Sequence, residues 1–144
     1  MSGFTIRRAV DEDIEEIFRM CMELADLSDD GDSVKTTPEN SASQPLIGYA
    51  LYVYTFSTWD GRSAFLNDIY VTPDHRGKGI GTDLLRTVAQ DVLDNGCVLM
   101  EWCVLNWNSN AIEFYKSKGA FDLTEAEHVH IYKMPKSSLE KLAK

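Results

Sequence analysis

A run of three glycines at alternate positions, Arg76-Gly77-Lys78-Gly79-Ile80-Gly81, limits the folds open to this 144-residue chain more than any other segment. Residues 63–71 before the run are rich in strand-forming side chains, and apolar residues after it repeat at helical spacing until Asn95-Gly96. A glycine-rich turn between a strand and a helix leaves backbone N–H groups unpaired at the positive end of the helix dipole. This arrangement predicts a cradle for an anion, although the same glycines would equally permit a tight turn without a ligand.

The spacing of these glycines excludes two common phosphate-binding motifs. The ATP-binding loop requires Gly-x-x-x-x-Gly-Lys followed by Ser or Thr, and the dinucleotide fingerprint requires Gly-x-Gly-x-x-Gly. Arg76, Gly79 and Gly81 instead give the pattern Arg-x-x-Gly-x-Gly. A second segment, residues 108–119, has the pattern Asn-x-x-Ala-x-x-Phe-Tyr-x-x-x-Gly.

With these two motifs the chain resembles the GNAT superfamily of N-acetyltransferases, and within it the spermidine/spermine (diamine) and thialysine acetyltransferases. Further stretches that carry the resemblance are Gly48-Tyr49-Ala50, Tyr54-Thr55-Phe56, Trp59-Asp60-Gly61, residues 68–71 and Trp107-Asn108. The resemblance implies an α/β (α+β) fold, in which a mixed, mostly antiparallel central sheet has helices on both faces and splayed central strands. It also implies an enzyme that transfers the acetyl group of acetyl-CoA, by direct attack, to the primary amine of a small cationic acceptor such as a polyamine, thialysine or lysine.

The resemblance places acetyl-CoA on the glycine-rich turn, on the backbone of the strand before it and on the second motif. The residues it implies for acetyl-CoA binding are Ile69, Tyr70, Val71, Arg76, Gly77, Lys78, Gly79, Ile80, Gly81, Thr82, Asn108 and Tyr115. Tyr115 is also the expected catalytic acid, which protonates the departing CoA thiolate. A phenol with a reference pKa of about 10 keeps its proton at neutral pH and is close enough to a thiol, at about 8.5, to deliver it.

The acceptor side of the expected site departs from the family pattern. Polyamine and thialysine enzymes usually carry an acidic pair before the splayed strand and another acid near the hairpin tip, where this chain has Asn67-Asp68 and Ser57. Trp59, Asn67 and Asp68 are the expected acceptor-binding residues. An alkyl ammonium with a pKa near 10 must lose a proton before it attacks. Asp68, Glu101 and an ordered water remain open as the base.

A polar segment, residues 26–45, stands where the family has a further helix and strand. Two interpretations follow from this difference. The acceptor site is more open, which would suit a protein lysine or N-terminal acetyltransferase, or the chain is a shortened form that binds acyl-CoA or a partner without turnover.

The net charge and the cysteines limit the partners and the cellular compartment that we expect. A formal net charge of −9 disfavours nucleic acid and anionic membranes as partners. The three cysteines, Cys21, Cys97 and Cys103, lie in apolar periodic segments, which predicts reduced, buried thiols in the cytoplasm. We expect no metal, because His128 and His130 lack a third ligand at metal spacing. The resemblance implies a homodimer.

The pattern predicts one domain over residues 1–144 with mixed hairpins and crossovers. The expected strands are residues 4–8, 46–56, 63–71, 98–105 and 129–134, and the expected helices are a helix with Asp11 as N-cap that extends to Ala25, one that ends at Asn95-Gly96, residues 110–118 capped by Gly119, and residues 137–144.

Overall fold

The computed structural model describes residues 3–26 and 45–143. The chain divides into two compact units, one ending at Cys103 and the other beginning at Val104. Nearly all of the polar segment expected over residues 26–45 lies outside the described residues.

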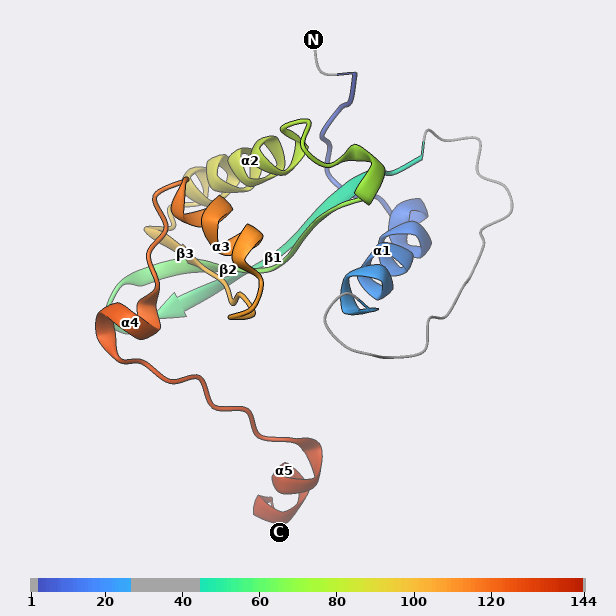
Figure 1. Ribbon diagram of the computed structural model, residues 1–144. Coiled ribbons are helices and arrows are strands. Elements are labelled where there is room, and N and C mark those ends of the chain that lie inside the picture. Colours follow the sequence, from blue (N-terminus) through green and yellow to red (C-terminus); the bar gives the residue numbers. More distant parts are fainter. Residues whose placement is uncertain (1–2, 27–44, 144) are drawn as a thin grey trace. The chain divides into compact units, whose positions relative to one another are not determined.

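In its described residues, the first unit contains one short sheet and two long helices (Figure 1). In chain order its elements are the 3-10 turn η1 (Asp11–Asp13), α1 (Ile14–Asp26), β1 (Gly48–Ser57), β2 (Gly61–Val71), the 3-10 turn η2 (Pro73–His75), α2 (Ile80–Asp94) and β3 (Leu99–Glu101). The expected hairpin and the helix after the glycine-rich run are therefore confirmed. α2 ends where Asn95-Gly96 predicts, with Gly96 at a φ of 73°.

The three strands lie in the order β1-β2-β3, antiparallel in the first pair and parallel in the second. Along β1 and β2 the pairing runs from Gly48 opposite Val71 to Ser57 opposite Gly61. Leu51 lies opposite Asp68 and Tyr52 opposite Leu66, so Asn67 is the extra residue of a β-bulge. A bulge reverses the alternation of side chains, so residues on either side of Asn67 with the same parity point to opposite faces.

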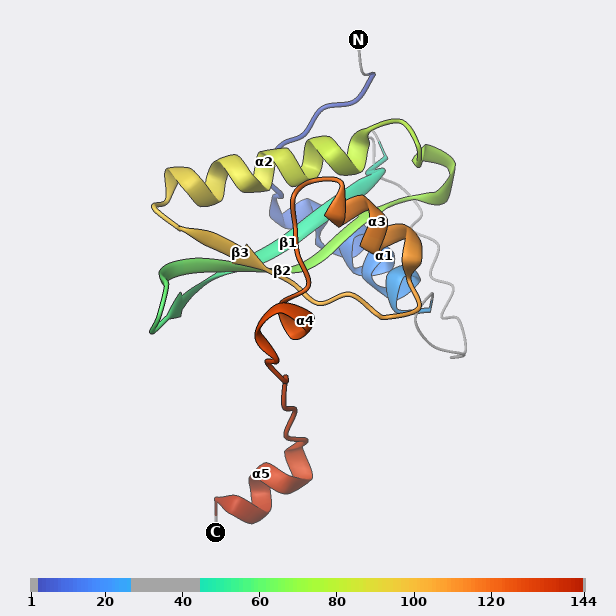
Figure 2. The ribbon, with the colours of Figure 1, turned by 60° about the vertical axis from the view of Figure 1, so that its left-hand side comes forward.

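Each face of the sheet packs against one helix, as the sequence predicts (Figures 1 and 2). On one face, Ala64 forms a buried cluster with Val88 and Val92 of α2 and with Cys97. On the other face, Tyr49 and Tyr70 form a second cluster with Met20 of α1. The apolar spacing along each helix thus produces two small cores that hold β2 between them.

The strand expected over residues 4–8 is absent. Phe4 and Ile6 are half-buried and Thr5 is exposed, so the alternation is real, but the segment pairs with no described strand. It is held instead by Arg8, which forms an ion pair with Asp91 of α2 at 2.5 Å. Asp11 lies inside η1 rather than at the helix N-cap, because Asp13 accepts the hydrogen bond from the backbone N–H of Val10.

Over residues 104–143 the second unit has three helices, α3 (Ser109–Lys116), α4 (Leu123–Glu127) and α5 (Lys136–Leu142). Gly119, at a φ of 93°, closes α3 as predicted. The strand expected over residues 129–134 is wrong, because that segment pairs with no described strand and most of its apolar side chains are well exposed. His128, at a φ of 56°, ends α4 and therefore does not share a strand face with His130.

The three cysteines are free thiols in different surroundings. Cys97 is buried as predicted, whereas Cys21 is half-buried and Cys103 is exposed. The prediction fails at Cys103 because β3 ends at Glu101, two residues earlier, so the apolar pattern continues past the end of the sheet.

Candidate functional site

The glycine-rich turn leads from β2 into α2. Thr72 anchors its start, because its backbone N–H and its hydroxyl both donate to the Ile47 carbonyl, at 2.9 and 3.2 Å. Gly77 and Gly79 then adopt φ angles of 73° and 84°, the left-handed region that glycine enters without steric cost. A Cβ at either glycine would meet no atom within 4 Å, so the space beside the turn is open.

A continuous row of backbone N–H groups borders this open space. The first hydrogen bond of α2 runs from the Asp83 N–H to the Gly79 carbonyl, at 3.0 Å. In the part of the chain that the structure describes, the N–H groups of residues 77–82 therefore donate to no carbonyl. The 15 residues of α2 add the positive end of their dipole at the same place, and the whole arrangement fits a phosphate or diphosphate.

Arg76 and Lys78 bring positive charge to this turn in a chain whose net charge is −9. The Nε of Arg76 donates to the Val71 carbonyl at 2.8 Å, and the guanidinium lies 5.4 Å from the centre of the Tyr70 ring. The Nζ of Lys78 donates to the Asp74 carbonyl at 3.0 Å. Two cations thus flank the row of N–H groups.

The edge of β2 next to the turn is only partly covered by β3. The pairing of β2 with β3 covers three positions and ends where Phe65 lies opposite Glu101. β2 continues to Val71, so the part that includes Ile69, Tyr70 and Val71 extends beyond its paired neighbour. This is the splay that the resemblance implies, and it leaves backbone groups available to an extended ligand that lies along the strand.

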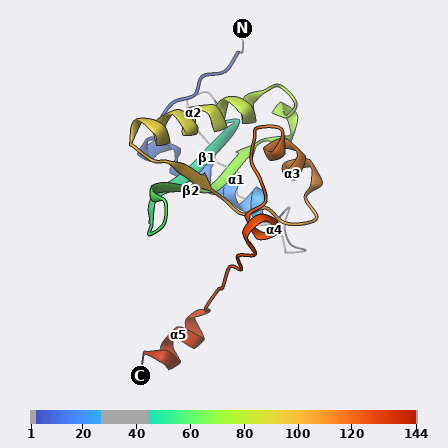
Figure 3. The ribbon, with the colours of Figure 1, turned by 90° about the vertical axis from the view of Figure 1, so that its left-hand side faces the viewer.

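The expected acceptor-binding residues do not form one cluster within the chain. Asn67 is exposed in the bulge, and Asp68 is half-buried on the face of β2 that packs against α1. Trp59 is 94% exposed in the turn between β1 and β2. This turn lies at the opposite end of β2 from the glycine-rich turn (Figure 3). At about 3.3 Å per residue, the strand separates Gly61 from Asp68 by roughly 23 Å.

Asn108 and Tyr115 lie at the two ends of α3 in the second unit. The Asn108 side chain is the N-cap and accepts a hydrogen bond from the Ala111 N–H at 3.2 Å. Tyr115 is half-buried and lies edge-on to Phe114, with 5.2 Å between ring centres. Burial raises the pKa of the Tyr115 hydroxyl above its usual value.

Comparison with known proteins decides the family. The profile described as "Acetyltransferase (GNAT) family" matches residues 8–120. The chain belongs to the GNAT acetyltransferase family. Among its relatives, thialysine N-epsilon-acetyltransferase of Sus scrofa is 36% identical over 168 aligned positions, which cover 99% of both chains. Spermidine/spermine N(1)-acetyltransferase-like protein 1 of Homo sapiens is 29% identical over 99% of this chain and 24% of its own length.

Solved structures agree on the fold of this GNAT acetyltransferase. The crystal structure of an aminoglycoside acetyltransferase from an uncultured soil metagenomic sample superimposes with a TM-score of 0.68 at 17% identity, over 92% of this chain and 96% of that one. This likeness shows the mixed sheet of the family, while the family profile and the thialysine acetyltransferase relative show an acyltransferase. The alignment with the pig relative is longer than this 144-residue chain, so that relative contains residues that this GNAT acetyltransferase lacks.

Several features of this GNAT acetyltransferase lie outside the sequence-based site. Two shallow surface hollows, one lined by residues that include Tyr54 and Arg62 and one by residues that include Gln90 and Asp94, lie away from the turn and add nothing to it. Among residues 3–26 and 45–143 there is no cluster of three metal-ligating side chains and no helix long and apolar enough to cross a membrane. The contacts of the Tyr70 side chain with α1 and Arg76 had no signal in the sequence, because they join three elements far apart along the chain.

Proposed function

We propose that this GNAT acetyltransferase uses acetyl-CoA and transfers its acetyl group to the primary amine of a small cationic acceptor, of the polyamine, thialysine or lysine class. The observation that carries the proposal is the row of N–H groups over residues 77–82, which lies directly after the uncovered edge of β2. A diphosphate on the turn would align the pantetheine arm with residues 69–71. Thialysine is the acceptor in the printed name of the pig relative, and this supports the acceptor class.

Both backbone groups and side chains bind acetyl-CoA in this proposal. The N–H groups of residues 77–82, with Arg76 and Lys78, hold the diphosphate oxygens, because donors and cations surround the open space there. Backbone groups of Ile69 and Val71, which point away from β1, bind the amide groups of the arm, whereas those of Tyr70 point toward Tyr49 of β1. Asn108 sets the start of α3 and so fixes the helix that carries Tyr115.

In the chemical step the acceptor amine attacks the thioester carbonyl, forming the C–N bond and then breaking the C–S bond. We propose that Asp68 accepts the proton of the incoming ammonium, because Asp68 is half-buried on the part of β2 that extends beyond β3, whereas Glu101 is exposed. An N–H group of the splayed strand stabilises the oxyanion of the tetrahedral intermediate. Tyr115 delivers a proton to the CoA thiolate, and its raised pKa keeps that proton in place at neutral pH.

Both units belong to one catalytic domain in this proposal. The family profile matches residues 8–120 and so continues across the boundary between Cys103 and Val104. A homodimer is also proposed, and the exposed Leu51 and Val53 side chains of β1, a strand that pairs only with β2 among the described residues, support it. Size-exclusion chromatography coupled to light scattering measures the oligomeric state.

The acceptor class is tested by incubating the protein and acetyl-CoA with spermidine, lysine, thialysine and a lysine-containing peptide, with mass spectrometry of the products. We expect acetylated product from at least one of the three small amines, at a higher kcat/KM than from the peptide. Faster acetylation of the peptide would replace the small-amine proposal with a protein acetyltransferase. Binding of acetyl-CoA without any acetylated product would contradict the proposal.

A further inference from the structure

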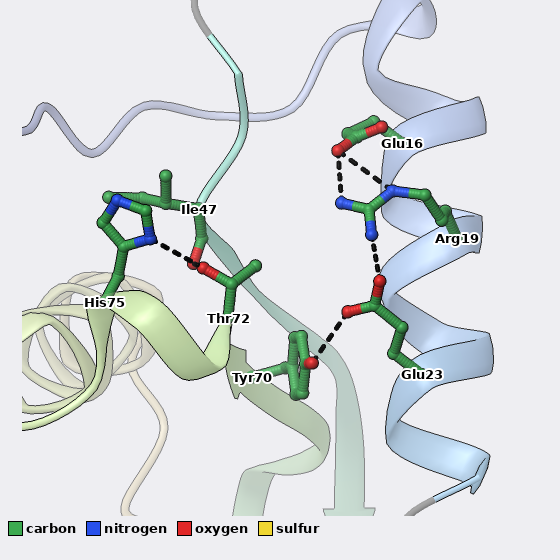
Figure 4. Close-up of polar contacts among 7 residues, drawn as sticks. All are labelled: Glu16, Arg19, Glu23, Ile47, Tyr70, Thr72 and His75. Atoms are coloured by element: carbon green, nitrogen blue, oxygen red, sulfur yellow. Dashed lines mark hydrogen bonds and ion pairs between the residues drawn. The ribbon is translucent and has the colours of Figure 1, made fainter. Parts of the chain in front are cut away.

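Tyr70 contacts both α1 and the glycine-rich turn. Its hydroxyl donates a hydrogen bond to Oε2 of Glu23 at 2.8 Å (Figure 4), and the Arg76 guanidinium lies over its ring, 5.4 Å from the centre. The residue is 4% exposed, so its ring has little freedom to move. One side chain of β2 therefore joins the helix on one face of the sheet to a cation of the candidate acetyl-CoA site.

The hydrogen-bond acceptor on α1 is itself held in place. Arg19 donates to the carboxylate of Glu23 through Nη1 and to the carboxylate of Glu16 through Nη2 and Nε, the latter two at 2.5 and 3.2 Å (Figure 4). All three residues lie on one face of α1, at i, i+3 and i+7. Contacts within α1 therefore orient the Glu23 carboxylate, independently of its hydrogen bond with Tyr70.

Arg76 is an exposed residue that is held at two points. Its Nε donates to the Val71 carbonyl at 2.8 Å, and its guanidinium carbon lies over the Tyr70 ring, 5.4 Å from the ring centre. A free arginine side chain loses rotamer entropy when it binds an anion, and a side chain that is already ordered loses less. Ordering of Arg76 before the ligand arrives therefore increases affinity for a phosphate on the turn.

We propose that Tyr70 is a positioning residue, whose ring holds the Arg76 guanidinium ready for the diphosphate of CoA while Glu23 fixes the ring from α1. This inference rests on the proposed function, since that function places the diphosphate at the glycine-rich turn. It adds a role for the Tyr70 side chain, which lies apart from the backbone contacts expected of residues 69–71. It also makes the affinity for CoA depend on the geometry of α1.

A double-mutant cycle on the Kd of CoA tests the role of Tyr70. Tyr70→Leu removes the cation–π contact and is expected to weaken CoA binding about tenfold. In an Arg76→Ala background the same change is expected to have almost no further effect, because Tyr70 acts through Arg76. Equal losses in the two backgrounds would overturn the proposal, because that result is expected from a general disturbance of the core.

Two milder variants separate the ring from its hydroxyl. Tyr70→Phe keeps the ring over Arg76 but loses the bond to Glu23, so we expect a weakening of CoA binding of about threefold. Glu23→Gln keeps an oxygen acceptor for the hydroxyl and should bind CoA within about twofold of the wild type. A loss in Tyr70→Phe as large as that in Tyr70→Leu would contradict the assignment of the effect to the ring.

Tyr49→Phe is the matched control. The Tyr49 ring lies 6.2 Å from the Tyr70 ring in the same cluster, and its buried hydroxyl has no hydrogen-bond partner among the described residues. We expect this variant to bind CoA as the wild type does, and a tenfold loss would show that any change in the cluster disturbs the turn. A wild-type protein that does not bind CoA would contradict the proposed function. The wild-type Kd therefore tests the proposed function, and the variants test the role of Tyr70.

Discussion

The Arg7 guanidinium donates two hydrogen bonds to the Asp13 carboxylate, at 2.5 and 2.8 Å. Asp13 also accepts the Val10 N–H at 2.9 Å, so one carboxylate closes the turn ahead of α1. The bond from Arg7, followed by that from Val10, lowers the pKa of Asp13 to about 2. Because this value lies below the roughly 3.9 of an unfolded aspartate, the carboxylate stabilises the native state above about pH 4, and this contribution is lost as the pH falls toward 2.

Asp13→Asn should therefore lower the thermal midpoint of unfolding at about pH 6, and the difference from the wild type should shrink between about pH 4 and pH 2. Thermal melts across this range, followed by circular dichroism, measure the effect. Asp11→Asn, at an exposed position of the same turn, is the control. A difference that stays constant from pH 6 to pH 2 would show that Asp13 is not stabilised as a carboxylate.

Gly79 and Gly81 make a matched pair for the turn. Gly79 has a φ of 84°, so Gly79→Ala forces a side chain into the left-handed region at a cost of about 1–2 kcal/mol. Gly81 lies inside α2, where a Cβ would lie 3.9 Å from Cγ2 of Val71, an ordinary contact. Alanine is favoured over glycine in a helix by about 1 kcal/mol, so Gly81→Ala should be neutral or stabilising. Urea denaturation compares the two, and equal destabilisation would contradict the assigned turn geometry.

Gly48 is required by the close approach of β1 and β2. A Cβ at this position would lie 2.6 Å from the carbonyl oxygen of Tyr70, so Gly48→Ala must displace the backbone next to the uncovered edge of β2. We expect a loss of about 1–3 kcal/mol in the free energy of unfolding, as for other overpacked sites. Gly3→Ala, where a Cβ would meet nothing within 4 Å, is the control for urea denaturation. Wild-type stability in Gly48→Ala would disprove this strand pairing.

The raised pKa of Tyr115 has a consequence for the pH profile of turnover. Burial favours the neutral phenol, so the group loses its proton only above its usual value near 10. We expect kcat to show no decline from loss of the Tyr115 proton between about pH 7 and pH 10. A decline of kcat near pH 8 that is absent in Tyr115→Phe would contradict this expectation.

Periodicity predicted the helices and the hairpin because each depends on residues close together in the chain. It failed at residues 4–8 and 129–134, where apolar alternation is present but none of the described strands pairs with the segment. Alternation reports which face a residue takes and does not identify a pairing partner. The missed helix α4 did have a local signal, since Asp122 accepts hydrogen bonds from the Thr124 and Glu125 N–H groups as an N-cap.

The candidate site was predictable to a similar degree. The tight turn at Gly77 and Gly79 follows from local sequence, and both glycines have a positive φ. The N-cap role of Asn108 was not predicted, although an asparagine at the start of a helix is a local signal for it. The bulge at Asn67 and the Glu23–Tyr70–Arg76 contacts depend on the register of two strands and the position of α1. No spacing along the chain encodes these contacts, so they were found only in the structure.

Tyr115→Phe tests the central claim, acetyl transfer from acetyl-CoA with Tyr115 as the acid, most directly. The measurement is the rate of CoA thiol release from acetyl-CoA with the best small amine, beside the Kd of acetyl-CoA for each protein. Tyr132→Phe, at a 92% exposed tyrosine of the same unit, is the control. We predict a fall in kcat of about 100-fold or more for Tyr115→Phe with an unchanged Kd, because the acid is lost and the binding contacts remain. A Tyr115→Phe variant that releases CoA at the wild-type rate would contradict the claim.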